Sequence, residues 1–138
     1  MTPKNLDNLI EEFNGYPTAE EKLEWIVTRK ADAGVLPDAY CIESARIQGC
    51  LSQLWLRGSI ESDSCLFQCR SDSNVVQGIM AFICDLYCGL TPEEVLTLGK
   101  VNIGIETMIS INRRQSVAAV FNYIQMFAQK CGAANEAL

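Results

Sequence analysis

Residues 47–56 have the sequence IQGCLSQLWL, and the rest of the chain is organised around them. Gly49-Cys50 is a small, permissive pair, because glycine lets the backbone bend sharply and approach another molecule closely. The apolar run after it indicates a buried strand. A thiol at a tight turn, anchored by a strand, could present sulfur chemistry to a partner protein. As a thiolate, cysteine is strongly nucleophilic. The alternative is that Cys50 is a small buried apolar residue, as free cysteines often are.

The composition is that of an ordinary globular chain. Of its 138 residues, 49% are hydrophobic and 20% are charged, and this length predicts one domain over residues 1–138. The net charge of −6 argues against binding to nucleic acid or to an anionic membrane surface. No apolar run approaches the roughly 20 residues of a membrane span, and the amino terminus lacks the apolar run of a signal peptide. We therefore expect a cytoplasmic protein.

Seven cysteines occur in the sequence, and in a reducing cytosol we expect them to be thiols. Cys65 and Cys69 would share a strand face, and Cys84 and Cys88 a helix face. These four could form a metal site, but their CxxxC spacing is wider than the usual CxxC of structural zinc sites, and the chain has no histidine. We expect them in the core, with no metal bound. Without histidine, activation of Cys50 would need arginine, lysine, a helix amino terminus or a partner protein.

Hydrophobic periodicity and capping residues predict an α+β fold, a small antiparallel β-sheet packed with surrounding helices. The predicted helices are near 3–14, 18–31, 73–88, 91–98 and 112–130, with a short one near 105–109, and the predicted strands are near 53–60 and 64–70. Residues 33–43 have no clear period and indicate a loop that wraps the core.

Individual residues add local predictions. Thr18-Ala19-Glu20-Glu21 and Thr91-Pro92-Glu93-Glu94 have the pattern of capping boxes. We expect Asp72 to cap the helix that follows it, Trp55 to lie in the core, and Gly89 to end a helix that is apolar on nearly every side.

Four motifs in order resemble the SufE/CsdE family of cysteine-desulfurase activators. Gly49-Cys50 followed by Ser52 and Trp55 is similar to the family's Gly-Cys-x-Ser-x-Val-Trp, although Leu51 and Leu54 replace the usual Gln and Val. Ser71-Asp72 with Val75-Val76-Gln77-Gly78, and Leu86-Tyr87-Cys88-Gly89-Leu90-Thr91-Pro92-Glu93-Glu94, are similar to two further family segments. Of the family's Ser/Thr-Pro-Ser-Arg-x-x-Gly, only Ser110 and Arg113 carry over, and Ser116 stands where the family has Gly.

The resemblance implies a SufE/IscU-like fold and a sulfur-acceptor function. Cys50 would accept persulfide sulfur from a pyridoxal-phosphate cysteine desulfurase of the SufS/CsdA kind, stimulate that enzyme and pass the sulfur to an Fe-S cluster scaffold. Arg113 would stabilise the thiolate or persulfide, while Arg46, Gly49 and Leu51 would contact the desulfurase. The resemblance implies no cofactor and no metal in the chain itself. The alternatives are an Fe-S or zinc scaffold of related fold, or a pure interaction module.

Overall fold

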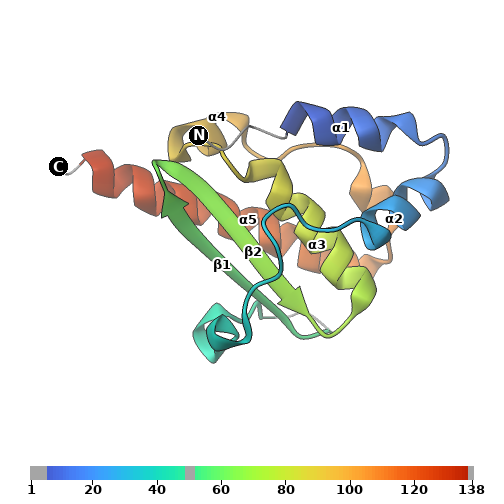
Figure 1. The fold of residues 1–138 in the computed structure, drawn as a ribbon, viewed down its shortest axis with the longest axis horizontal. Coiled ribbons are helices and arrows are strands. Elements are labelled where there is room, and N and C mark those ends of the chain that lie inside the picture. Colours follow the sequence, from blue (N-terminus) through green and yellow to red (C-terminus); the bar gives the residue numbers. More distant parts are fainter. Residues whose placement is uncertain (1–5, 49–51, 137–138) are drawn as a thin grey trace.

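A hairpin of two strands packs against helices in the computed structural model, which describes residues 6–48 and 52–136. The elements in chain order are α1 (Leu6–Gly15), α2 (Ala19–Thr28), the 3₁₀ helices η1 (Asp38–Tyr40) and η2 (Glu43–Ala45), β1 (Leu54–Glu61), β2 (Ser64–Ser71), α3 (Asn74–Tyr87), α4 (Pro92–Leu98), the 3₁₀ helix η3 (Ile105–Met108) and α5 (Ile111–Glu136). The α+β prediction is therefore confirmed (Figure 1).

Strands β1 and β2 pair in antiparallel register from Leu54 opposite Ser71 to Glu61 opposite Ser64. The turn between them places Ser62 and Asp63 at φ 49° and 68°, the left-handed values of a tight two-residue hairpin turn. Alternate side chains of β2 are buried in the core, and so are Leu54 and Leu56 at the start of β1, as the period of two requires. Within the described residues the sheet has these two strands, and one isolated bridge joins Arg46 to Trp55.

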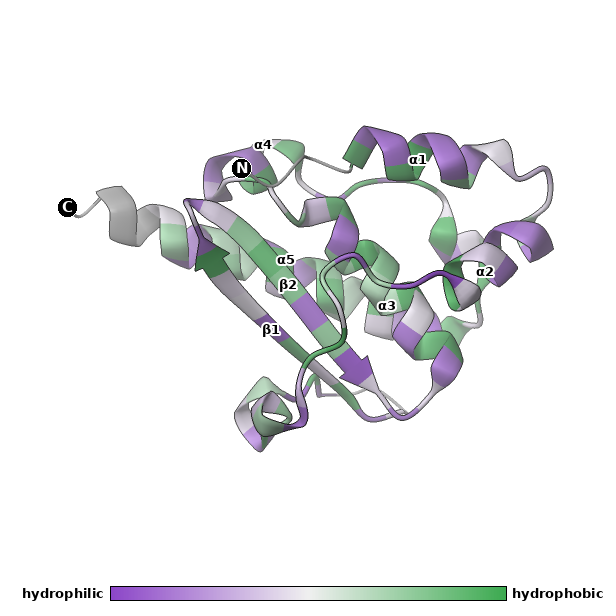
Figure 2. Cartoon of the chain, in the orientation of Figure 1, coloured by the Kyte–Doolittle hydropathy of each residue, from purple (hydrophilic) through white to green (hydrophobic). Residues whose placement is uncertain are grey.

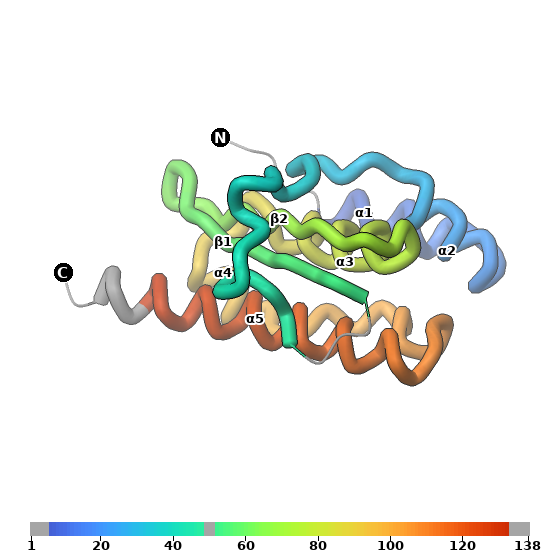
Figure 3. Tube along the Cα trace, turned by 90° about the horizontal axis from the view of Figure 1, so that it is seen from below, coloured from blue at the N-terminus to red at the C-terminus, as the bar shows by residue number. Residues whose placement is uncertain are grey.

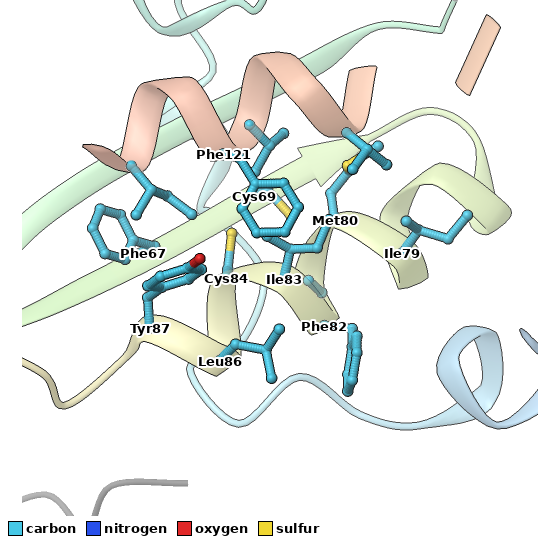
Figure 4. Close-up of a cluster of buried hydrophobic side chains, with 14 of the residues drawn as sticks. Phe67, Cys69, Ile79, Met80, Phe82, Ile83, Cys84, Leu86, Tyr87 and Phe121 are labelled. Atoms are coloured by element: carbon cyan, nitrogen blue, oxygen red, sulfur yellow. The ribbon is translucent and has the colours of Figure 1, made fainter. Parts of the chain in front are cut away.

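Helix α3 is buried on nearly every side because the hairpin, α2 and α5 surround it. Figure 4 shows side chains of β2, α3 and α5 meeting in this core, with Cys69 and Cys84 close together. Cys65, Cys69, Cys84 and Cys88 are all buried, as predicted. The Tyr87 hydroxyl is also buried, and it donates to the Gly99 carbonyl oxygen at 2.7 Å and accepts from the Val101 N–H at 2.9 Å.

Helix boundaries follow their caps. The Thr91–Glu94 capping box forms both of its bonds. At Thr18 the hydroxyl accepts the Glu21 N–H at 3.1 Å, but no return bond from the Glu21 carboxylate occurs within the described part of the chain. The predicted cap Asp72 is wrong, because the Ser73 hydroxyl caps α3 by accepting the Val76 N–H.

Helix α2 ends at Thr28, earlier than the predicted residue 31. Arg29 is already extended, and its guanidinium reaches Asp85 of α3 at 2.9 Å. The Asp85 carboxylate also accepts the backbone N–H of Asp32, at 2.9 Å. A buried carboxylate needs such partners, so the tertiary bond, rather than helix propensity, decides where α2 stops. At the other end of the chain, α5 continues beyond the predicted residue 130 to Glu136.

The segment between α2 and β1 crosses the outer face of the hairpin (Figure 1). The Leu36 N–H donates to the Cys69 carbonyl oxygen at 3.1 Å, and the Arg70 side chain donates to the Leu36 carbonyl oxygen at 2.8 Å. Trp55 points to this outer side and is half-buried, so its predicted place in the core is wrong. The predicted loop over 33–43 is confirmed; it contains η1, and η2 begins at its last residue.

Hydropathy separates the inner and outer helices. Helix α1 carries hydrophilic residues between its apolar ones, and so does α2 (Figure 2), while most residues of α3 are buried. Among the described residues no single helix is long and apolar enough to span a membrane, and α3 and α4 pass that test only as a pair bent by 111°.

Candidate functional site

Gly49, Cys50 and Leu51 lie outside the described residues, so the structure characterises the site through the residues on either side of them. Ser52, on the carboxyl side, lines a pocket of about 190 Å³. The other lining residues are Val76, Ser110, Asn112, Arg113 and Ser116. Figure 3 shows why these distant segments meet: the start of β1 lies near the amino-terminal part of α5.

Hydrogen bonds hold the chain segments on either side of residues 49–51. On the carboxyl side, the Asp72 carboxylate accepts the Gln53 N–H at 3.0 Å, and the Asp72 N–H donates to the Gln53 carbonyl oxygen at 3.4 Å. On the amino side, the Ile47 N–H donates to the Leu54 carbonyl oxygen at 2.8 Å. Hydrogen bonds thus hold Ile47 to Leu54 and Gln53 to Asp72, on either side of residues 49–51. Asp72, rejected as a helix cap, has this role instead.

Arg113 lies at the amino terminus of α5, where the unpaired N–H groups give the helix a positive end. Its own N–H donates to the Ser110 hydroxyl at 3.4 Å. The Arg113 side chain is half-buried, and no carboxylate pairs with its guanidinium in the described ranges 6–48 and 52–136. A guanidinium without an acidic partner, beside a helix amino terminus, favours anions in the pocket.

The structure does not bring Arg46 to this pocket. Arg46 bridges to Trp55 on the outer side of β1, and its guanidinium lies 3.9 Å from the Glu43 carboxylate. The Glu43 side chain is exposed and that of Arg46 is partly exposed, so this long ion pair contributes little stability. Arg46 remains four residues before Cys50, on the approach to it.

Burial makes several of the described cysteines poor nucleophiles, because it raises the pKa of their thiols. Burial raises the pKa of Cys65 to about 11 and that of Cys88 to about 12. A hydrogen bond with the Cys69 thiol, together with burial, raises the pKa of Cys84 well above its ordinary value. Burial also raises the pKa of Cys131. These four side chains remain neutral thiols at neutral pH, and a thiol attacks sulfur far more slowly than a thiolate does.

In the described part of the chain, no three Cys, Asp or Glu side chains are arranged so that they could hold a metal ion. Cys41 is half-buried in the outer loop, and its Sγ lies 3.6 Å from the Pro37 carbonyl oxygen.

Comparisons with known proteins agree with this architecture. The sequence model of the SufE family, described as an Fe-S metabolism associated domain, matches residues 7–128. The chain belongs to the SufE family. Its fold is similar to the solution structure of a hypothetical protein from Thermus thermophilus, with a TM-score of 0.69 and 19% identity over 94% of this chain and 97% of the other.

Curated SufE relatives span most of the chain. An uncharacterised SufE-like protein of Synechocystis is 24% identical over 89% of this chain and 79% of its own length. One of Rhizobium meliloti is 22% identical over 91% of this chain and 95% of its own length. A chloroplastic quinolinate synthase of Arabidopsis thaliana is 25% identical over 76% of this chain, but the match spans 16% of that enzyme. As a SufE-family member, this chain is associated with Fe-S metabolism.

Ser116 is a pocket residue to which the sequence analysis assigned no role. It lies one turn after Arg113 on α5, so helical spacing places both on one face. That spacing was the available signal, but it could not show that this face meets the start of β1.

Proposed function

We propose that this SufE-family chain accepts sulfur on Cys50 from a cysteine desulfurase, stimulates that enzyme and delivers the sulfur to an Fe-S cluster scaffold. The observation that carries the proposal is the shared pocket of Ser52 and Arg113. It brings a positive helix end and a half-buried guanidinium to a residue that follows Cys50 closely in the chain. Such surroundings favour a thiolate over a thiol.

The transfer step needs no external oxidant. The Cys50 thiolate attacks the terminal sulfur of the desulfurase persulfide, and a new S–S bond forms to Cys50. The S–S bond within the desulfurase breaks, and its cysteine leaves as a thiolate with the bonding electrons. Cys50 then carries a persulfide, whose terminal sulfur can be passed to an acceptor in the same way.

Arg113 would stabilise the anionic forms of Cys50 electrostatically. Gly49, Leu51 and Arg46 would meet the desulfurase, since they precede or adjoin the reactive residue. This protein would work in the cytoplasm and would contribute a thiol and a docking surface, with no turnover of its own.

The alternative function, an Fe-S or zinc scaffold, would need at least two further ligands beside Cys50. Four of the cysteines that could serve as ligands are instead buried in the core: Cys65, Cys69, Cys84 and Cys88. The observations therefore favour the acceptor over the scaffold.

Replacement of Cys50 by serine tests the proposal. A serine hydroxyl is not ionised at neutral pH and cannot hold a transferable persulfide. With a cysteine desulfurase and cysteine as substrate, we expect the parent chain to gain about 32 Da, one sulfur atom, and to raise sulfide release. The Cys50→Ser variant should do neither. Its free energy of unfolding should fall by no more than about 1 kcal/mol, because the change in volume is small.

Cys41→Ser is the matched control, because Cys41 is half-buried and lies in the loop before β1. This control should acquire the sulfur mass and stimulate the desulfurase as the parent does. Full stimulation by Cys50→Ser, or loss of the mass shift in Cys41→Ser, would show that the assignment of Cys50 is wrong.

A further inference from the structure

The buried ion pair between the end of α2 and α3 engages one oxygen of the Asp85 carboxylate. The Arg29 Nη2 atom donates to Asp85 Oδ2 at 2.9 Å, and the Asp32 N–H donates to the same oxygen at 2.9 Å. The side chains of Arg29 and Asp85 are 9% and 1% exposed. A carboxylate accepts at two oxygens and a guanidinium donates from all of its nitrogens, so both groups can form further hydrogen bonds.

Two atoms of this pair are buried without a hydrogen-bond partner among the described residues: Asp85 Oδ1 and Arg29 Nη1. Burial of a polar atom without a partner costs free energy, and it costs more when the group is charged. Buried polar atoms of folded proteins almost always bond to protein or to ordered water. Two such atoms, on groups that already touch, therefore point to a small molecule bound between them.

The chemistry of the two atoms restricts what can bind. Asp85 Oδ1 needs a donor, whereas Arg29 Nη1 needs an acceptor. The charge of Arg29 repels a cation, and that of Asp85 repels an anion. Aromatic rings confine the site, because the guanidinium carbon of Arg29 lies 5.6 Å from the centroid of the Trp25 ring and 5.7 Å from that of Phe82. A small neutral molecule that both donates and accepts is required, and water meets this requirement.

We propose that a buried water molecule joins Asp85 to Arg29, donating a hydrogen bond to Asp85 Oδ1 and accepting one from Arg29 Nη1. The two groups already touch through Oδ2 and Nη2, so one water can bridge their remaining atoms. Burial raises the pKa of Asp85, and the bonds from Asp32 and Arg29 oppose that rise. A further bond from water stabilises the carboxylate in the same direction.

The proposed water lies where the chain leaves α2. Arg29 is the first residue after this helix, and the segment that follows it leads to β1. The water completes the hydrogen bonding of the junction that joins α2, this segment and α3. The site is independent of the proposed sulfur transfer, because it involves neither Cys50 nor the residues beside it.

A high-resolution crystal structure of the full chain tests the proposal directly. We expect an ordered water whose oxygen lies about 2.7–3.2 Å from both Asp85 Oδ1 and Arg29 Nη1. A direct hydrogen bond between these two atoms would overturn the proposal. Ordered side chains without such a water, or with a water that bonds to one of the two atoms alone, would overturn it as well.

Magnetic relaxation dispersion of the water oxygen counts long-lived buried waters in solution and provides a second test. The double variant Arg29→Met/Asp85→Leu removes both polar groups, and replacement of a buried ion pair by apolar residues is often tolerated. We expect its dispersion amplitude to fall by about one water molecule relative to the parent. If this variant does not fold, the crystal structure of the parent decides the question.

The matched control is Asp38→Leu/Arg70→Met, which makes the same changes at a pair open to solvent, with side chains 91% and 38% exposed. This control should keep the dispersion amplitude of the parent, because a water at an exposed pair exchanges rapidly with the solvent. An unchanged amplitude in the buried-pair variant, or an equal fall in both double variants, would show that no long-lived water bridges Arg29 and Asp85.

Discussion

At the scale of single residues, the Cys88 thiol completes the outer edge of β2. Its Sγ accepts the Phe67 N–H at 3.4 Å and donates to the Phe67 carbonyl oxygen at 3.5 Å. Further along this edge, Leu36 and Leu90 supply backbone bonds to Cys69 and Cys65. An exposed strand edge can pair with other chains. Here the Cys88 side chain forms the hydrogen bonds that the backbone of a neighbouring strand would otherwise form with Phe67.

Replacing Cys88 therefore has two separable effects. Cys88→Ala leaves both backbone groups of Phe67 buried without this partner and opens a small cavity, and we expect a loss of about 2–3 kcal/mol in the free energy of unfolding. Cys88→Ser keeps a donor and an acceptor and should lose about half as much. Urea titrations followed by circular dichroism measure both. Equal losses in the two variants would show that the hydrogen bonds contribute nothing.

At the scale of elements, Gly78 lets α2 approach α3. A Cβ at this position would lie 2.7 Å from the Val27 Cα and 3.0 Å from the Ile26 carbonyl oxygen. Both are backbone atoms, which cannot rotate away as a side chain can. The two helices would have to move apart. This movement would also weaken the aromatic contact between Trp25 and Phe82, whose ring centroids are 5.5 Å apart.

Glycine-to-alanine changes at two helical positions should thus change the free energy of unfolding in opposite directions. Gly78→Ala should lower the free energy of unfolding by about 2 kcal/mol, because overpacking exceeds the gain in helix propensity. Gly132→Ala, in α5, places the new methyl group no nearer than 4.0 Å to the described atoms of other elements and should raise the free energy of unfolding by about 0.5–1 kcal/mol. Thermal unfolding of the two variants beside the parent is the measurement. A stabilised Gly78→Ala variant would contradict the close approach of α2 and α3.

At the scale of the whole molecule, burial of acidic protons makes the fold sensitive to alkali. Burial raises the pKa of Cys65 from 9.0 to about 11, that of Cys88 from 9.0 to about 12, and that of Tyr87 from 10.0 to about 12. A raised pKa means that the folded state holds its proton more firmly than the unfolded state does. This contribution to stability is complete below pH 9 and is lost as the pH rises toward 11–12.

We expect the free energy of unfolding to fall by at least about 2 kcal/mol between pH 9 and pH 10, because the thiols of Cys65 and Cys88 each contribute about 1 kcal/mol over that interval and the Cys84 thiol, whose pKa is also raised, adds to the fall. Urea titrations in the presence of a phosphine reductant measure the fall without disulfide formation. In Cys88→Ser, whose hydroxyl does not titrate there, the fall over this interval should be smaller by about 1 kcal/mol. A stability that stays constant up to about pH 10.5 would contradict the burial of these thiols.

The sequence by itself determined most elements and their order, because their signals are local. The Thr91–Glu94 box, Gly89 after α3 and the alternation of Cys65, Phe67 and Cys69 each depend on residues within one turn or one strand. The same holds for the Gly-Cys motif and the family it indicates. Arg113 was also predicted, although only from a resemblance, since nothing local connects it to Cys50.

Only the tertiary structure decided how these elements use their side chains. Asp72 holds the Gln53 backbone instead of capping a helix, because a distant N–H lies within its reach. Trp55 faces outward, because the period of two sets which residues share a face but packing sets which face is covered. The pocket of Ser52, Arg113 and Ser116 joins segments that are far apart in the sequence. Contacts of that range depend on the relative placement of β1 and α5, and no local pattern in either segment contains it.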